Sequence, residues 1–215
     1  SVNLDLPPFT LVAATTRENL LSHPLRSRFG ATFRLDYYAL GDIETIITRS
    51  AKLLGVPIVS AATSRLATAS RRTPRVANRL LKRARDYAQV GGGVSIGADS
   101  AVSGAVAHSA RAGAHATPEI TEDIAKKTLN LLEIDELGLE PQDRRLLQVI
   151  IEKFRGGPVG LQTLAAALSE ERGVLEDIYE PYLMALGFLQ RTSAGRIALP
   201  AAYDHLSMRH AQELL

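Results

Sequence analysis

The chain has 215 residues, of which 46% are hydrophobic and 22% are charged, and its formal net charge is +2. This length and composition predict a globular protein with one or two real cores in one to three small domains, and they argue against wholesale disorder. No apolar run reaches the about 18 residues of a membrane span, and the lack of cysteine excludes disulfides and thiolate chemistry and is compatible with a reducing, cytoplasmic compartment.

The charges are unevenly distributed along the chain. Residues 71–85 contain seven cations and no acid, whereas residues 133–143 are acidic. A basic cluster in a nearly neutral chain indicates a local anionic ligand. The five histidines lack metal-ligand spacing, so we expect no metal site. The first residues, "SVNLDLPPF", lack both Met and a signal-peptide pattern, and we interpret the chain as part of a longer protein.

Residues 1–40 predict part of an open α/β sheet. Residues 9–14, "FTLVAA", are a short apolar run typical of a buried strand, and residues 31–38 alternate like a second strand after a helical turn or two. Open sheets bind ligands at the carboxyl ends of their strands. Arg28 lies between the two predicted strands, and its guanidinium suits phosphate oxygens. The alternative for a single arginine is a surface ion pair with a nearby acid.

From Gly41 the pattern becomes helical. Asp42 is expected to cap a helix, and residues 60–70 predict a second, weaker helix. The apolar stripe of the first helix is Ile43, Ile46, Ile47, Ala51 and Leu54.

A third helix is predicted to start at Thr73, as the N-cap, with Pro74 in the first helical position, and to run to about Val90. Residues 91–117 are mostly Gly, Ala and Ser and predict a flexible linker, after which Pro118 begins another helix. The apolar face of the third helix is Ala77, Leu80, Leu81, Ala84 and Ala88.

From Gly138 onward the pattern predicts a winged-helix domain, which is three helices followed by a β-hairpin. Such modules bind DNA more often than protein. Arg191 and Arg196 flank the hairpin turn, where two cations can contact a phosphate backbone or a minor groove. The expected core is Leu164, Ala167, Leu168, Leu175, Ile178 and Leu183.

Several long segments resemble the RuvB family of AAA+ ATPases. They include "DLPPFTLVAATTRENLLSHPLRSRFG", "TPRVANRLLKRARDYAQV" and "KFRGGPVGL…EPYL…GFLQRT", and only about 91–117 lies outside the resemblance. The implied fold is an α/β remnant of an AAA+ core at 1–40, an all-α lid at 41–137 and a winged helix at 138–215.

The resemblance implies a nucleotide site shared between subunits. Arg28 resembles the arginine finger that completes the ATP site of a neighbouring subunit, and Thr16, with Thr15 as the neighbouring candidate, resembles the sensor-1 residue. Tyr38 resembles the residue beside adenine. Arg75 resembles sensor 2, and it lies at a helix N-terminus, which favours anions; a solvated arginine is the alternative.

The resemblance also implies nucleic-acid and protein partners. Arg191 and Arg196 match positions that contact DNA in the family. Val2 and Leu4 match a hairpin that docks on RuvA, although they are as well explained as strand residues that pack inward.

The function implied by the resemblance is that of an ATP-driven homo-hexameric motor, with ATP as cofactor. It moves Holliday junctions along double-stranded DNA in recombination, DNA repair and the SOS response. The sequence contains no Walker A lysine and no acidic Walker B strand, so Mg²⁺ would be held by residues absent from this chain, and the chain alone is expected to be inactive. The alternative function is a stand-alone winged-helix DNA-binding adaptor without ATPase activity.

Overall fold

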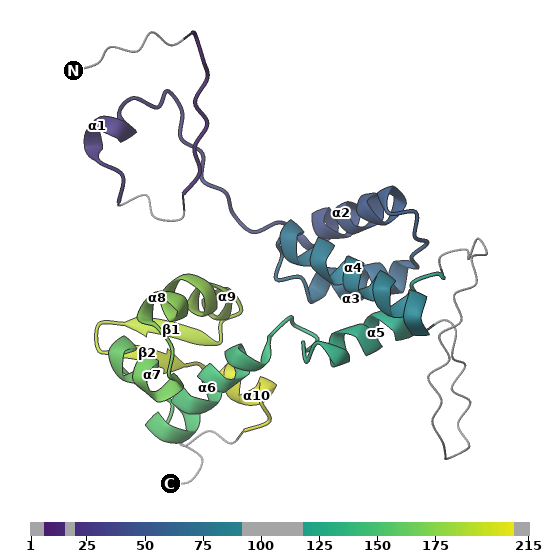
Figure 1. The fold of residues 1–215 in the computed structure, drawn as a ribbon. Coiled ribbons are helices and arrows are strands. Elements are labelled where there is room, and N and C mark those ends of the chain that lie inside the picture. The colour runs from purple at the N-terminus through teal and green to yellow at the C-terminus, as the bar shows by residue number, and fades with distance from the viewer. Residues whose placement is uncertain (1–6, 16–19, 92–117, 209–215) are drawn as a thin grey trace. The chain divides into compact units, whose positions relative to one another are not determined.

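The computed structural model describes residues 7–15, 20–91 and 118–208 (Figure 1). These residues belong to two compact units, Ser1–Asp36 and Tyr37–Leu215.

Several predictions concern residues outside the described part of the chain. Val2, Leu4 and Thr16 lie there, and so does the predicted linker from residue 92 to residue 117.

The described part of the first unit contains one short helix, α1 (His23–Arg26), and no strand. The prediction of strands at 9–14 and 31–38 is therefore wrong for this structure. Their large side chains are exposed, with Val12 at 87% and Leu35 at 91%. A strand needs a hydrogen-bonded neighbour, and in the described residues the one sheet pairs residues 189–198 with each other.

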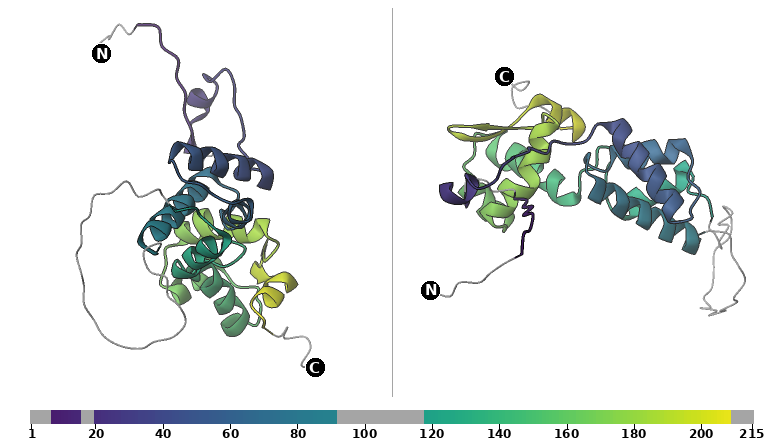
Figure 2. Two further views of the ribbon diagram at one scale, coloured as in Figure 1. Left: turned by 90° about the vertical axis from the view of Figure 1, so that its right-hand side faces the viewer. Right: turned by 90° about the horizontal axis from the view of Figure 1, so that it is seen from above.

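The second unit contains two helical bundles, which can be followed in Figures 1 and 2. The first bundle consists of α2 (Leu40–Leu53), α3 (Ser60–Thr68), α4 (Pro74–Gly91) and α5 (Glu122–Leu131). Its core is Ile43, Ile47, Ala51, Val56, Ala62, Leu66, Ala67, Ala69, Ala77, Leu80, Leu81, Ala84, Ile120, Ala125, Leu129 and Ile134.

Most of the apolar faces predicted in the first bundle are buried. Ile43, Ile47 and Ala51 of α2 follow each other four residues apart and are at most 1% exposed, as a helix with one inward face requires. The five predicted apolar residues of α4 are also at most 1% exposed.

The predicted helix starts were less accurate in this bundle. Helix α2 begins at Leu40, so Asp42 lies inside the first turn and is not the cap. Helix α5 begins at Glu122 after Thr121, whose hydroxyl accepts the Ile124 N–H at 3.4 Å. The segment after Pro118 is extended instead, because its backbone pairs with the segment before α3 through the Ile58–Ile120 bridge.

The second bundle is the predicted winged-helix arrangement. It consists of α6 (Pro141–Phe154), α7 (Leu161–Leu168), α8 (Arg172–Val174), a π-helical turn (Leu175–Tyr179), α9 (Glu180–Ala185), β1 (Leu189–Thr192), β2 (Gly195–Ala198) and α10 (Pro200–His205). Its core is Leu139, Leu146, Leu147, Val149, Ile150, Val159, Leu161, Leu164, Ala165, Leu168, Leu175, Tyr182, Leu183, Phe188, Leu189, Ala198, Ala202 and Tyr203.

The hairpin carries a third extended segment on its free edge. Val159 exchanges backbone hydrogen bonds with Arg196 at 2.8 and 2.9 Å, and the Ala198 N–H donates to the Gly156 carbonyl at 2.9 Å. A side chain at Gly157 would overlap the Arg196 carbonyl, so this close approach depends on glycine.

Of the predicted winged-helix core, Leu164, Leu168, Leu175 and Leu183 are buried, and Ala167 packs at the edge of the core. Ile178 was predicted wrongly, because it is 56% exposed.

Tyr182 generates a testable pH dependence. Burial raises its pKa to about 12, and its hydroxyl donates to the Leu137 carbonyl at 2.5 Å. The folded state therefore favours the neutral phenol, and this stability is complete below the unfolded pKa of about 10 and is lost as pH rises through 12. The comparison is with Tyr182→Phe, which cannot ionise at this position. We expect the unfolding free energy of the native chain, minus that of the variant, to fall by about 3 kcal/mol over that interval, at 1.36 kcal/mol per pKa unit. Urea unfolding of both proteins at pH 9 to 12 measures it, and a constant difference would contradict the expectation.

Candidate functional site

The resemblance assigns Arg28 and Thr16 to ATP hydrolysis, and of these two residues the structure describes Arg28. It follows α1 in an exposed turn, where its backbone N–H donates to the Leu25 carbonyl at 3.2 Å. Its guanidinium makes no hydrogen bond or ion pair with another described residue, so the surface ion pair considered above is not formed in the described chain. Thr15 lies in an exposed irregular segment.

The start of α4 brings two predicted nucleotide residues into one neighbourhood. Arg75 lies in the first turn and is exposed, and the Tyr38 backbone N–H donates to the Arg72 carbonyl at 3.2 Å. Thr73 directly precedes Pro74 at the start of α4, as predicted, and its carbonyl accepts the Ala77 N–H at 3.0 Å. Its hydroxyl donates backward to the Ser70 carbonyl at 3.1 Å.

Arg72 lies in the turn directly before α4. Its φ of 53° and the 54° of Arg71 lie in the left-handed region, which glycine enters most easily. The turn before α4 thus keeps the backbone conformation that glycine favours, although two arginines form it.

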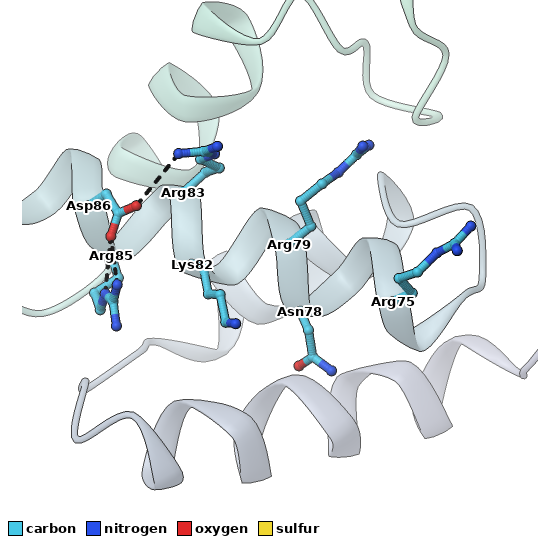
Figure 3. Close-up of a pocket in the computed structure, with 7 residues that line it drawn as sticks. All are labelled: Arg75, Asn78, Arg79, Lys82, Arg83, Arg85 and Asp86. Atoms are coloured by element: carbon cyan, nitrogen blue, oxygen red, sulfur yellow. Dashed lines mark hydrogen bonds and ion pairs between the residues drawn. The ribbon is translucent and has the colours of Figure 1, made fainter.

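A shallow hollow of about 520 Å³ runs along α4 and is drawn in Figure 3. Two acids partly neutralise it: Asp86 pairs with Arg85 at 2.8 Å, and Glu140 pairs with Arg79 at 2.9 Å. Its lining residues are Arg75, Asn78, Arg79, Lys82, Arg83, Arg85 and Asp86.

Three lining groups have no side-chain partner in the described chain. Arg75 and Lys82 have no side-chain partner there, and the Asn78 Oδ1 is buried without one. Arg75 is a cation at the N-terminus of α4, a position that favours phosphate, and Lys82 adds a second cation about two turns further along the helix. These residues therefore fit the phosphate end of a nucleotide.

The wing arginines both bind one buried carboxylate. Glu180 is fully buried, and it accepts from Arg191 Nη2 at 2.6 Å and from Arg196 Nε at 2.7 Å and Nη2 at 3.2 Å. Arg191 also pairs with Glu176 at 3.3 Å. The hydrogen bond to Glu180 raises the pKa of Arg191.

The two arginines therefore differ, although both flank the hairpin turn as predicted. The Arg196 side chain is only 12% exposed, whereas that of Arg191 is 43% exposed. Arg196 donates to Glu180 through two nitrogens. If Arg191 turns toward a ligand, the buried Glu180 carboxylate therefore still has a hydrogen-bond donor.

Glu180 was not singled out from the sequence. The available signal was its position three residues before the buried Leu183, which places an acid near the inner side of a helix.

Neither metal ligation nor membrane insertion is indicated by the described residues. They contain no group of three or more His, Cys, Asp or Glu side chains that could hold a metal ion. Among them, no helix combines the length and apolar character needed to cross a bilayer.

Three family models match the chain. The RuvB C-terminal winged helix domain matches residues 136–207, and the RuvB AAA lid domain matches residues 38–109. The Holliday junction DNA helicase RuvB P-loop domain matches residues 1–35.

Solved structures of Thermotoga maritima RuvB are similar to the chain. One mutant of that protein is 44% identical with a TM-score of 0.80, covering 97% of this chain and 62% of its own length. The structure named as the Holliday junction branch migration motor is 45% identical with a TM-score of 0.78, over 94% of this chain and 60% of that one. The chain thus spans less than two thirds of these relatives.

The unequal arginines predict unequal stability effects. Arg196→Ala leaves Glu180 with one partner in place of two and should cost about 3 kcal/mol of unfolding free energy, as for a broken buried ion pair. Arg191→Ala removes a more exposed partner and should cost about 1 kcal/mol or less. Chemical denaturation of both variants measures this, with Arg145→Ala as an exposed-arginine control. Equal losses would contradict the assignment.

Proposed function

This chain belongs to the RuvB family, and we propose that it forms the lid, the DNA-binding domain and the finger-bearing edge of an ATP-driven motor that moves Holliday junctions. The observation that carries the proposal is the start of α4, where Arg75 lies at a helix N-terminus and has no side-chain partner in the described chain. The Tyr38 N–H donates to the carbonyl of Arg72, three residues before Arg75. Such an arrangement suits a nucleotide phosphate.

The proposed nucleotide site is completed by two subunits. Arg75 would act as sensor 2 on the phosphates, Tyr38 would lie beside the adenine, and Thr16 would orient the attacking water. Arg28 would reach the ATP of the neighbouring subunit, where a fixed guanidinium stabilises charge that develops on the transferred phosphoryl group. ATP and Mg²⁺ would be held mainly by a P-loop and an acidic strand, neither of which this sequence contains.

The proposed nucleic-acid ligand is double-stranded DNA at a Holliday junction. Arg191 is the better placed of the two wing arginines, because it is more exposed and shares its acid with Arg196. A branch-migration motor must cross every sequence, and phosphate contacts carry little base information.

The proposed assembly is a cytoplasmic homo-hexamer that docks on RuvA through Val2 and Leu4. The alternative of a stand-alone DNA-binding adaptor is not favoured, because RuvB lid and P-loop models match the chain together with the winged-helix model.

The finger assignment predicts a kinetic defect. This chain alone should hydrolyse no ATP, and in a form that also carries a P-loop, Arg28→Ala should lower turnover roughly 10³–10⁵-fold with nucleotide affinity nearly unchanged. Arg28→Lys keeps the charge and loses the planar fork, so it should recover only part of the rate. Steady-state hydrolysis and nucleotide titration separate the two effects. Weakened binding with normal turnover of bound ATP would argue against the role in trans.

The DNA assignment predicts a salt effect. Arg191→Ala should weaken duplex binding equally on unrelated sequences, and the slope of log K against log salt should flatten by about 0.9, the value for one lost phosphate contact. Glu176→Gln is the matched variant, because it releases Arg191 from a competing acid and should strengthen binding. Fluorescence anisotropy across a salt series measures both. If folded Arg191→Ala binds as the native chain does, the DNA surface lies elsewhere, and the basic face of α4 becomes the better candidate.

A further inference from the structure

Arg71, in the turn between α3 and α4, connects the two bundles of the second unit. Its Nε donates to the Gly138 carbonyl at 2.9 Å, and its Nη2 donates to the Asp143 carboxylate. Its guanidinium lies 5.2 Å from the ring centroid of Tyr182. The Arg71 side chain is 13% exposed and that of Asp143 is 0% exposed, so these contacts are shielded from water and salt.

The segment that receives Arg71 is itself held in place. The Asp135 carboxylate accepts the N–H groups of Leu137 at 3.0 Å and Leu139 at 2.8 Å. Arg144 of α6 donates to the carbonyls of Leu139 and Glu133, each at 2.8 Å. The connection between the bundles is therefore an ordered surface and not a loose tether.

The backbone fits this contact as well as the side chains do. Gly138 has a φ of 82°, and a side chain there would overlap the Ala69 carbonyl. Glycine thus lets the connecting segment lie directly against the turn that ends in Arg71 and Arg72 and begins α4.

A second bridge between the bundles is weaker. Arg79 of α4 pairs with Glu140 at 2.9 Å, but the two side chains are 55% and 37% exposed. Exposed ion pairs are screened and contribute little. Among the described residues, Arg71 is the one cation of α4 and its preceding turn that pairs with a buried acid.

We propose that Arg71 is a positioning residue that makes the winged-helix domain follow α4 as one rigid body. Its role in the motor rests on the function proposed above: Arg75 lies four residues further along, in the first turn of α4. If the nucleotide displaces α4, the winged-helix domain would then move with it, because the connection between the bundles does not bend.

The test uses the absence of cysteine in the chain. Spin labels on cysteines introduced at the exposed Lys52 and Gln162 report one distance between the bundles by double electron–electron resonance. The native chain should give one narrow distribution, and Arg71→Gly should broaden it at least about twofold, because loss of the guanidinium removes all three contacts. Arg72→Gly is the matched control, with nearly the same φ and an exposed side chain, and should leave the distribution narrow.

Label pairs within each bundle separate positioning from folding. The pairs Lys52 with Lys126 and Gln162 with Ser193 should keep their native distributions in Arg71→Gly. A narrow distance between the bundles in that variant, or broadening within the bundles, would overturn the proposal. If Arg71→Gly does not fold, Arg71→Lys gives the same test, since an ammonium cannot span Gly138 and Asp143 with a planar fork. These measurements need neither DNA nor nucleotide, so a motor that fails to bind either would refute the proposed function and leave this inference standing.

Discussion

Two carboxylates that folding removes from water control how this chain is assembled. Asp143 and Glu180 are both 0% exposed, and an unpaired charge in such a place costs several kcal/mol. Each is neutralised by arginine from another element: Asp143 by Arg71 from the turn before α4, and Glu180 by Arg191 and Arg196 from the hairpin. The contact between the bundles and the placement of the wing thus both come from arginines that neutralise a buried carboxylate.

Asp143 shows that such a pair is retained for geometry more than for stability. One of its oxygens accepts both the Glu140 N–H at 2.8 Å, which caps α6, and the Arg71 guanidinium, while the other has no hydrogen-bond partner among the described residues. Burial raises its pKa even though Arg71 opposes the shift. An apolar residue would avoid this cost, but it could not fix the start of α6 and the position of Arg71 at once.

The sequence predicted what local periodicity determines. Ile43, Ile47 and Ala51 lie four residues apart and are buried in α2, and the hairpin turn falls where Gly195 allows it. Strands at 9–14 and 31–38 failed, because a strand depends on partners that local pattern does not contain. The buried acids were missed for a related reason: Arg71 and Asp143 are 72 positions apart. Among the candidate site residues, sequence placed Arg75 at a helix start correctly but gave no sign that Arg191 and Arg196 share an acid.

The misplaced Ile178 and the unexpected Glu180 have one cause. Between Leu175 and Tyr179 the helix widens to a π turn, and the Glu180 N–H donates to the Leu175 carbonyl five residues back. In an α-helix, residues three and four positions after the buried Leu175 would share its inner face, and these are Ile178 and Tyr179. In the wider turn the fifth residue takes that place, so Glu180 turns inward and Ile178 is left in solvent. Pro181 follows directly and cannot donate a backbone bond, which limits the wide turn to this site. The π turn therefore places Glu180 where it can bind both hairpin arginines. Because Arg196 is the more buried partner, Arg191 is the one that can turn toward a ligand.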